Sequence, residues 1–263
     1  MTGQRVDLLT MAGIGMALMP LLTMWHEIGG HAAACAVQGG HVATIGAFYV
    51  ECTGLSGIAD IIVALAGVTV NAILACIAYL LWRGAKGDRA RLLLWLIWVS
   101  ESFVAAGYFC FSGATGFGDL GTGEGGSLTG MPMPLAWRVG EFAFGVIAYI
   151  LLVRAAIRTL TIMLGDSEET GSARRRIAHV YYATAGLAAV VVGLMNPVGI
   201  VITIMSAAAS SFGGLAGFIS IGFATPHGTE TRPFVLARSW PLLLFGIACL
   251  AAFAILFGPS RNF

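Results

Sequence analysis

The chain has 263 residues, of which 58% are hydrophobic and only 10% are charged, and its mean hydropathy is +0.87. A soluble domain averages about 25% charged residues. This composition therefore excludes an ordinary globular domain with a wetted surface and predicts an all-α polytopic membrane protein embedded in the lipid bilayer. The formal net charge of only +1 argues against nucleic acid as a partner.

Apolar stretches define the expected helices. A helix that crosses the hydrocarbon needs about 20 apolar residues. The sequence predicts six or seven such helices, near residues 8–28, 57–82, 91–112, 136–160, 178–202, 204–223 and 239–257. The fifth and sixth stretches run together around Asn196 and Pro197, where we expect a helix break because proline removes a helical hydrogen bond.

Three stretches between the helices are not apolar. Residues 39–56 alternate loosely, which predicts a short β-hairpin or a re-entrant segment. Residues 113–134 are glycine-rich and contain Asp119 and Glu124, and residues 165–176 are predicted to be a solvated loop. The five cysteines are scattered without a C-x-x-C pair, so we expect neither a disulfide framework nor a metal cluster from them.

The placement of positive charge predicts a topology. In the part of the chain up to the fifth expected helix, ten Lys and Arg residues fall on the same side of the membrane as the N-terminus. Arg138 alone falls on the other side. Cytoplasmic loops are enriched in these residues, which favours a cytoplasmic N-terminus. The residues His26, Asp60, Asp119 and Glu141 would then lie towards the non-cytoplasmic side, compatible with one shared site.

The first apolar stretch ends in the sequence HEIGGH, residues 26–31. Ionisable groups at membrane depth are costly and usually mark a functional site. The run is close to the zinc-hydrolase motif H-E-x-x-H, in which two histidines bind the metal and the glutamate is general base, but it holds one additional residue. On a regular helix His26 and His31 would be about 140° apart. A π-bulge absorbs one extra residue, and Gly29 and Gly30 would ease that distortion.

A resemblance to a known family rests on these residues. The segment 26–34, HEIGGHAAA, resembles the H-E-h-G-H-a-x-a motif of the site-2 proteases, which are intramembrane zinc metalloproteases. The segment 66–72, AGVTVNA, is similar to the family's A-G-P-x-x-N-x motif, with Val68 in place of proline. The resemblance covers about residues 8–82. It implies a three-helix metalloprotease-like core with a glycine-rich loop in residues 1–134 and additional transmembrane helices in residues 135–263.

The resemblance also implies roles for individual residues. His26 and His31 would bind Zn²⁺, Glu27 would be the general base, and Asn71 would hold a substrate strand or an oxyanion. For Asn71, an interhelical hydrogen bond is an equally open interpretation. Asp119, in the sequence GDL, is the candidate for the third metal ligand.

The third ligand stays open at this point. Asp119 is equally compatible with a turn residue in a glycine-rich loop. Glu101 is an alternative because a carboxylate in the middle of an apolar stretch is expensive, and His41 follows a Gly-Gly turn from which it could reach the metal.

The expected function is that of a zinc metalloendopeptidase that hydrolyses peptide bonds in or near transmembrane segments of membrane-protein substrates. The stretch 39–56 could pair with an unwound substrate segment by strand addition. Two alternatives remain: a non-catalytic, protease-like membrane scaffold, and a cation or proton transporter with a path through His26, Glu27, Glu101 and Glu141. The charge bias places the site towards the non-cytoplasmic face of the membrane. The resemblance implies the opposite face, since many site-2 proteases work nearer the cytoplasm.

Overall fold

The computed structural model of the protein describes residues 3–123, 125–224 and 227–263. Seven helices among these residues are long and apolar enough to cross a membrane. The prediction of an all-α polytopic membrane protein is therefore confirmed, with seven rather than six spans. Their bounds are Leu8–Val37, Ile58–Gly84, Asp88–Thr115, Pro134–Leu164, Glu168–Gly193, Ile200–Phe223 and Trp240–Phe257.

Two of the spans are composite. The first contains α1 (Leu8–Met24), the π-helix η1 (Trp25–Ala32) and α2 (Ala33–Val37). The sixth contains α7 (Ile200–Ile202), the π-helix η3 (Thr203–Gly213) and α8 (Gly217–Phe223). The other spans are α3 (Ile58–Gly84), α4 (Asp88–Thr115), α5 (Pro134–Leu164), the 3₁₀ turn η2 (Glu168–Thr170) with α6 (Gly171–Gly193), and α9 (Trp240–Phe257).

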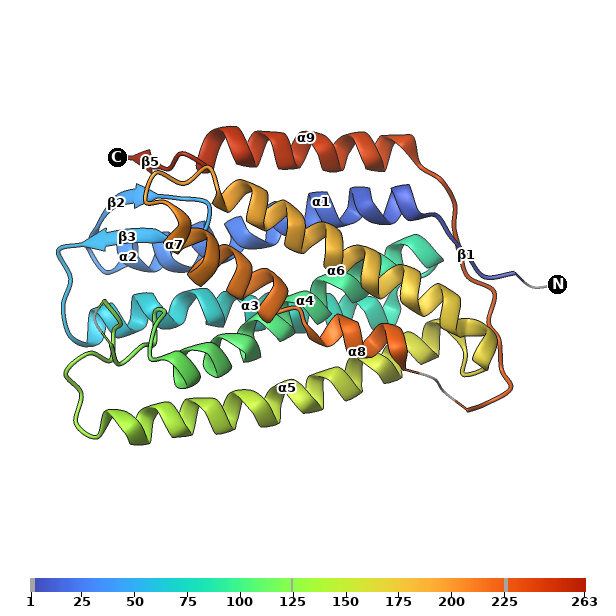
Figure 1. Ribbon diagram of the computed structural model, residues 1–263, viewed down its shortest axis with the longest axis horizontal. Coiled ribbons are helices and arrows are strands. Elements are labelled where there is room, and N and C mark those ends of the chain that lie inside the picture. Colours follow the sequence, from blue (N-terminus) through green and yellow to red (C-terminus); the bar gives the residue numbers. More distant parts are fainter. Residues whose placement is uncertain (1–2, 124, 225–226) are drawn as a thin grey trace.

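The helices pack around one contiguous core (Figure 1). Helix α1 contacts α9 and α6, while α4 contacts α3 on one side and α5 on the other. The largest side chains of the core that are fully buried include Trp95 and Phe103 of α4, Tyr181 of α6 and Phe218 of α8. The core therefore joins the first four spans to the later ones.

Short strands close the two ends of the bundle. At the N-terminal end, β1 (Arg5–Val6) pairs in parallel with β4 (Val235–Leu236). At the opposite end, β2 (His41–Ile45) pairs in antiparallel fashion with β3 (Val50–Thr53) and with β5 (Arg261–Asn262). The structure thus selects the hairpin rather than the re-entrant segment, and β3 is an edge strand.

Two cysteines correct the prediction that no disulfide would form. Cys35 in α2 is bonded to Cys52 in β3. The sequence concealed this pair because its members are 17 residues apart and meet only when the hairpin folds back onto the first span. The bond ties the hairpin to the segment that carries the HEIGGH run.

The helix break at Asn196 and Pro197 is confirmed, because α6 ends at Gly193 and α7 begins at Ile200. The Asn196 side chain accepts a hydrogen bond from the amide of Val198 (3.0 Å). This bond stabilises the turn between the two helices.

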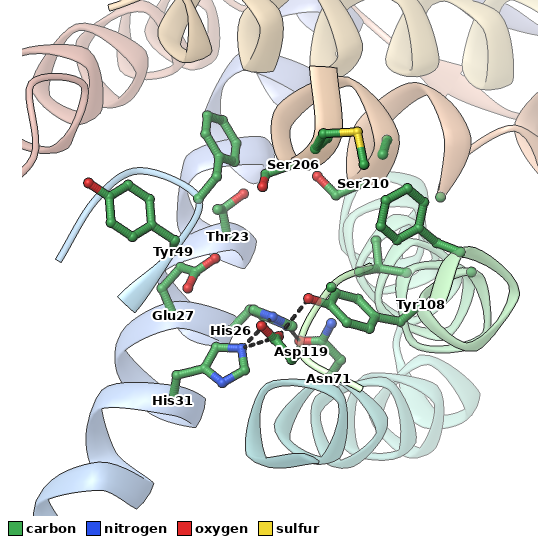
Figure 2. A pocket seen from close by; sticks show the side chains of 18 of the residues that line it. Thr23, His26, Glu27, His31, Tyr49, Asn71, Tyr108, Asp119, Ser206 and Ser210 are labelled. Carbon is green, nitrogen blue, oxygen red and sulfur yellow. Dashed lines mark hydrogen bonds and ion pairs between the residues drawn. The ribbon is translucent and has the colours of Figure 1, made fainter. Parts of the chain in front are cut away.

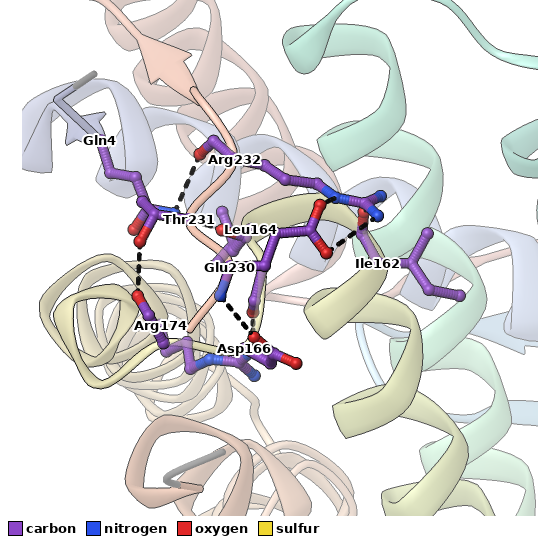
Figure 3. A network of polar contacts seen from close by, with 10 residues as sticks. Gln4, Ile162, Leu164, Asp166, Arg174, Glu230, Thr231 and Arg232 are labelled. Carbon is purple, nitrogen blue, oxygen red and sulfur yellow. Dashed lines mark hydrogen bonds and ion pairs between the residues drawn. The ribbon is translucent and has the colours of Figure 1, made fainter. Parts of the chain in front are cut away.

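Residues 165–176 are not the solvated loop that their polarity predicts. Helix α6 begins at Gly171, and Arg174 within it is fully buried. Its guanidinium donates to the hydroxyls of Thr170 (3.0 Å) and Thr161 (2.9 Å) and to the Gly165 carbonyl (2.8 Å). Residues 230–232 lie beside this cluster, where Glu230 exchanges hydrogen bonds with Asp166 and the Arg232 amide donates to the Leu164 carbonyl (Figure 3). Hydrogen-bonded partners are what allow a charged side chain to be buried.

Candidate metal centre

The HEIGGH run adopts the distortion that its spacing requires. Residues Trp25–Ala32 form a π-helix inside an otherwise α-helical span. In a π-helix the hydrogen bonds run from residue i to residue i+5, so residues five apart lie above one another. This geometry turns His26 and His31 to the same side, and their Nε2 atoms lie 3.0 Å apart.

Hydrogen bonds at the far nitrogens orient both imidazoles. His31 Nδ1 lies 2.8 Å from the carbonyl oxygen of Val63 on α3, to which it can only donate. Asn71 also lies on α3. Its amide forms the most hydrogen bonds in the orientation in which its oxygen accepts from His26 Nδ1 (3.1 Å). When both rings are neutral, as metal binding requires, a proton on each Nδ1 leaves each Nε2 with a free lone pair that faces the other ring. This is the orientation that a histidine metal ligand requires.

A carboxylate completes the group. Asp119 lies in the glycine-rich loop after α4, and its Oδ2 is 3.1 Å from His31 Nε2. Burial by itself raises the pKa of Asp119, but when His31 is protonated its charge and its hydrogen bond, together with the hydrogen bond from Tyr108, outweigh burial and lower that pKa to about 2. Asp119 is therefore ionised at neutral pH, as a metal ligand must be.

The donor set fits a zinc ion. Nε2 of His26, Nε2 of His31 and a carboxylate oxygen of Asp119 all lie within 4.8 Å of one another. Tetrahedral zinc with ligands at about 2.1 Å places neighbouring ligand atoms roughly 3.4 Å apart, close to the 3.0 and 3.1 Å found here. Three lone-pair donors that converge in this way repel one another unless a metal ion or a proton lies between them. Two histidines and one carboxylate also match the three-ligand sets of catalytic zinc sites.

Tyr108 is a member of the site that the sequence analysis missed. Its hydroxyl donates to Asp119 Oδ2 (2.6 Å), and its ring lies against His26 with the ring centres 5.7 Å apart. Tyr108 stands in an apolar stretch of α4, where a tyrosine is a common core residue. Its role depends on the path by which the glycine-rich loop returns to α4, and no motif marks that path.

Asn71 links the metal site to a buried carboxylate. In the orientation that serves His26, its amide nitrogen donates to the Glu101 carboxylate (3.1 Å) and to the Gly67 carbonyl (3.2 Å). Glu101 and Asn71 are only 2% and 1% exposed. Glu101 therefore supports the ligand His26 through Asn71, and it is absent from the ligand cluster. The expected role of Asn71 towards a substrate stays a prediction.

Gly67 allows α3 to approach the two histidines. A methyl group added to its Cα would lie 2.6 Å from His26 Nε2 and closer still to His31 Nε2. A methyl group added to Gly30 would lie 2.6 Å from the Cα of Gly67. Glycine at both positions brings the π-helix and α3 into direct backbone contact, which fixes the site against α3.

Glu27 faces an open cavity beside the ligand cluster. Its side chain is 5% exposed, and its Oε2 has no hydrogen-bond partner among the described residues. Figure 2 shows its carboxylate directed into the cavity, near the candidate ligand atoms of His26 and Asp119. The cavity of about 550 Å³ lies within the range of roughly 300–1,000 Å³ that ligand sites occupy. A buried carboxylate without a partner points to a ligand or water as its partner.

The remaining candidates lie elsewhere. His41 on β2 is exposed and Glu141 on α5 is half-buried, and both lie outside the ligand cluster. Asp60 borders the cavity near the start of α3. Glu124 lies outside the described residues. Of the candidates for a third ligand, the structure thus brings Asp119 to the two imidazoles.

Comparisons with protein-family models, with curated proteins and with solved structures found no match to this chain.

Proposed function

We propose that the protein is an intramembrane zinc metalloprotease in which His26, His31 and Asp119 hold the zinc ion and Glu27 is the general base. The observation that carries the proposal is the convergence of three lone-pair donors beside a buried carboxylate that has no partner. The resemblance of residues 26–34 and 66–72 to site-2 proteases agrees with this assignment.

The chemistry follows from the arrangement of these groups. A zinc ion, when bound, supplies the Lewis acidity that polarises the scissile carbonyl and acidifies the attacking water. Glu27 takes the proton of that water as its oxygen bonds to the carbonyl carbon. Glu27 then returns the proton to the nitrogen as the carbon–nitrogen bond breaks. The low exposure of Glu27 (5%) removes competing bulk water from this transfer.

The hairpin offers a way to hold the substrate. A peptide bond in a helix is shielded by its own hydrogen bonds, so a transmembrane substrate must unwind before it is cleaved. Val50 and Cys52 of the edge strand β3 line the cavity. An unwound segment that adds to this edge gains backbone hydrogen bonds and lies beside Glu27.

We further propose that the N-terminus is cytoplasmic and that the site faces the opposite side of the membrane. Of the 14 Lys and Arg residues, Arg138 near the start of α5 and Arg261 in β5 belong to the end of the bundle that holds the site. Ten others lie in or near β1, β4, the connection between α3 and α4 and the start of α6, and Arg154 and Arg158 lie in the second half of α5. Cytoplasmic segments carry such an excess. The Cys35–Cys52 disulfide at the site end agrees, because disulfides persist in oxidising, non-cytoplasmic compartments.

The orientation is testable in intact cells. After brief reduction, a membrane-impermeant maleimide is expected to label the partly exposed Cys52 from outside, whereas a cysteine introduced at the exposed Arg175 is labelled only after permeabilisation. The reverse pattern would place the site at the cytoplasmic face.

The test of the metal is elemental mass spectrometry of the detergent-purified protein. We expect about one zinc per chain, as a three-ligand site requires, and its loss in the His31→Ala and Asp119→Ala variants. The matched variant His41→Ala removes an exposed histidine outside the cluster and is expected to retain zinc. Zinc absent from the wild-type protein even after it is supplied would favour the non-catalytic scaffold.

The test of the base is proteolysis of reconstituted protein. Glu27→Gln is expected to keep zinc and lose turnover, because an amide accepts no proton from water. Glu168→Gln, at an exposed position on the opposite end, is the control and is expected to behave as wild type. Full turnover by the Glu27→Gln variant would refute the assignment.

A further inference from the structure

The cavity has a second polar wall opposite the metal ligands. Residues Met205, Ser206, Ala209 and Ser210 of the π-helix η3 line it, together with Gly214 after the helix. Figure 2 shows the Ser206 and Ser210 side chains directed into the cavity, facing Glu27 and Asp119 across it. The expected catalytic motifs, all in residues 1–134, do not account for this wall.

The two hydroxyls are available to a ligand. A serine inside a helix usually bonds back to a carbonyl one turn earlier, as Ser211 does to Ala207. Ser206 has no hydrogen-bond partner among the described residues, and the contact of Ser210 with the Ala207 carbonyl is a long 3.5 Å. Both serines are only partly buried, because the cavity lies in front of them.

The spacing of the serines suits an extended ligand. Ser206 and Ser210 are four residues apart and lie on one face of η3, so their hydroxyls form a row along the cavity. The residue between them on this face, Ala209, and the following Gly214 are small, which lets another backbone approach closely. The buried Oε2 of Glu27, which lacks a partner, faces the same space from the other side and independently indicates that a ligand belongs there.

We propose that Ser206 and Ser210 are substrate-positioning residues that hydrogen bond to the backbone of an unwound transmembrane segment while Glu27 faces its scissile bond. The substrate class that this wall fits is a transmembrane segment with small residues, Gly, Ala or Ser, at the cleaved position. Small side chains let the substrate backbone reach the hydroxyls across the wall of Ala209 and Gly214. This inference rests on the proposed proteolysis.

The experiment compares two synthetic transmembrane peptides with identical flanks, one with a Gly-Ala-Ser core and one with a Leu core, as substrates of the reconstituted protein. The double variant Ser206→Ala/Ser210→Ala removes both hydroxyls without changing the shape of the wall. Its control is Ser220→Ala, at an exposed position on α8. In addition, Ala209→Leu places a larger side chain in the cavity in front of the two serines. Its control is Ala208→Leu, at the neighbouring residue, which does not line the cavity.

We expect the wild-type protein to prefer the Gly-Ala-Ser core. The double variant should raise KM for this peptide roughly fivefold to 150-fold with kcat little changed, since the two hydrogen bonds together contribute about 1–3 kcal/mol. Ala209→Leu should raise KM further, while both control variants match wild type. A double variant whose KM equals that of Ser220→Ala would overturn the inference.

The design separates this inference from the proposed function. Zinc content is measured for every variant, so that loss of the site is not mistaken for loss of substrate binding. If the wild-type protein cleaves neither peptide, the proposed protease function fails, and the dissociation constant of the labelled Gly-Ala-Ser peptide replaces KM. An equal dissociation constant in the double variant would then overturn the role of the two serines.

Discussion

Gly67 on α3 lies against the imidazole of His26 with no space for a side chain, because a methyl group on its Cα would come within 2.6 Å of His26 Nε2. The same methyl group would also collide with His31. The glycine of the AGVTVNA segment thus acts on the metal site directly, through the absence of a side chain.

Replacing Gly67 by alanine is therefore expected to displace both histidines. We expect the Gly67→Ala variant to lose at least roughly tenfold in zinc affinity and to be destabilised by about 1–3 kcal/mol, as for other overpacked sites. Zinc titration and thermal unfolding measure the two effects. Gly84→Ala, at the end of the same helix with nothing within 4 Å of the added methyl group, should change neither. Equal zinc affinity in the two variants would contradict the close approach.

Tyr108→Phe removes one hydroxyl and keeps the ring against His26. Because that hydroxyl donates to Asp119 Oδ2 at 2.6 Å, its loss frees the Asp119 side chain, and we expect zinc affinity to fall about tenfold to a hundredfold. Tyr79→Phe is the control, since the hydroxyl of Tyr79 has no hydrogen-bond partner in the described residues. Unaltered zinc affinity would show that Asp119 is held by its loop alone.

Asn71→Ala separates two roles for the amide. If Asn71 orients His26, as its contacts with Nδ1 and with Glu101 indicate, the variant should bind zinc about tenfold to a hundredfold more weakly. Restoring saturation with added zinc should then recover most of the turnover. If Asn71 instead holds the substrate or an oxyanion, zinc affinity will be unchanged and kcat/KM will fall. Zinc titration followed by kinetics at saturating zinc distinguishes these outcomes.

Arg174→Ala tests the polar cluster at the N-terminal end. The variant leaves the acceptors on Thr161, Thr170 and Gly165 without their donor in a fully buried site. We expect a loss of about 2–4 kcal/mol in the free energy of unfolding, seen as a lower melting temperature in detergent. Arg175→Ala, at the exposed neighbouring position, should shift stability by no more than about 0.5 kcal/mol. The absence of a difference between the two variants would indicate that the cluster contributes nothing to stability.

Local features of the sequence predicted much of this molecule. The length of each apolar stretch set the number of spans, because crossing the hydrocarbon is a requirement on consecutive residues. The five-residue spacing of His26 and His31 required a distorted helix, and the π-helix over Trp25–Ala32 meets that requirement. The break after α6 follows from local chemistry, because Pro197 cannot continue a helix and the Asn196 side chain accepts from the nearby Val198 amide.

Other features were decided only when distant segments met. The glycine-rich loop folds back against α4, and this packing brings Asp119, rather than Glu101 or His41, next to the two imidazoles. The same packing made Tyr108 part of the site, and the folding of the hairpin onto the first span paired Cys35 with Cys52.

Burial in particular was invisible along the chain. Arg174 stands in a polar stretch that reads as a loop, yet its donors satisfy acceptors on two other segments, and this makes a buried charge tolerable. Hydropathy records the cost of transferring one residue from water. Whether that cost is offset depends on partners that only the tertiary structure brings within hydrogen-bonding distance.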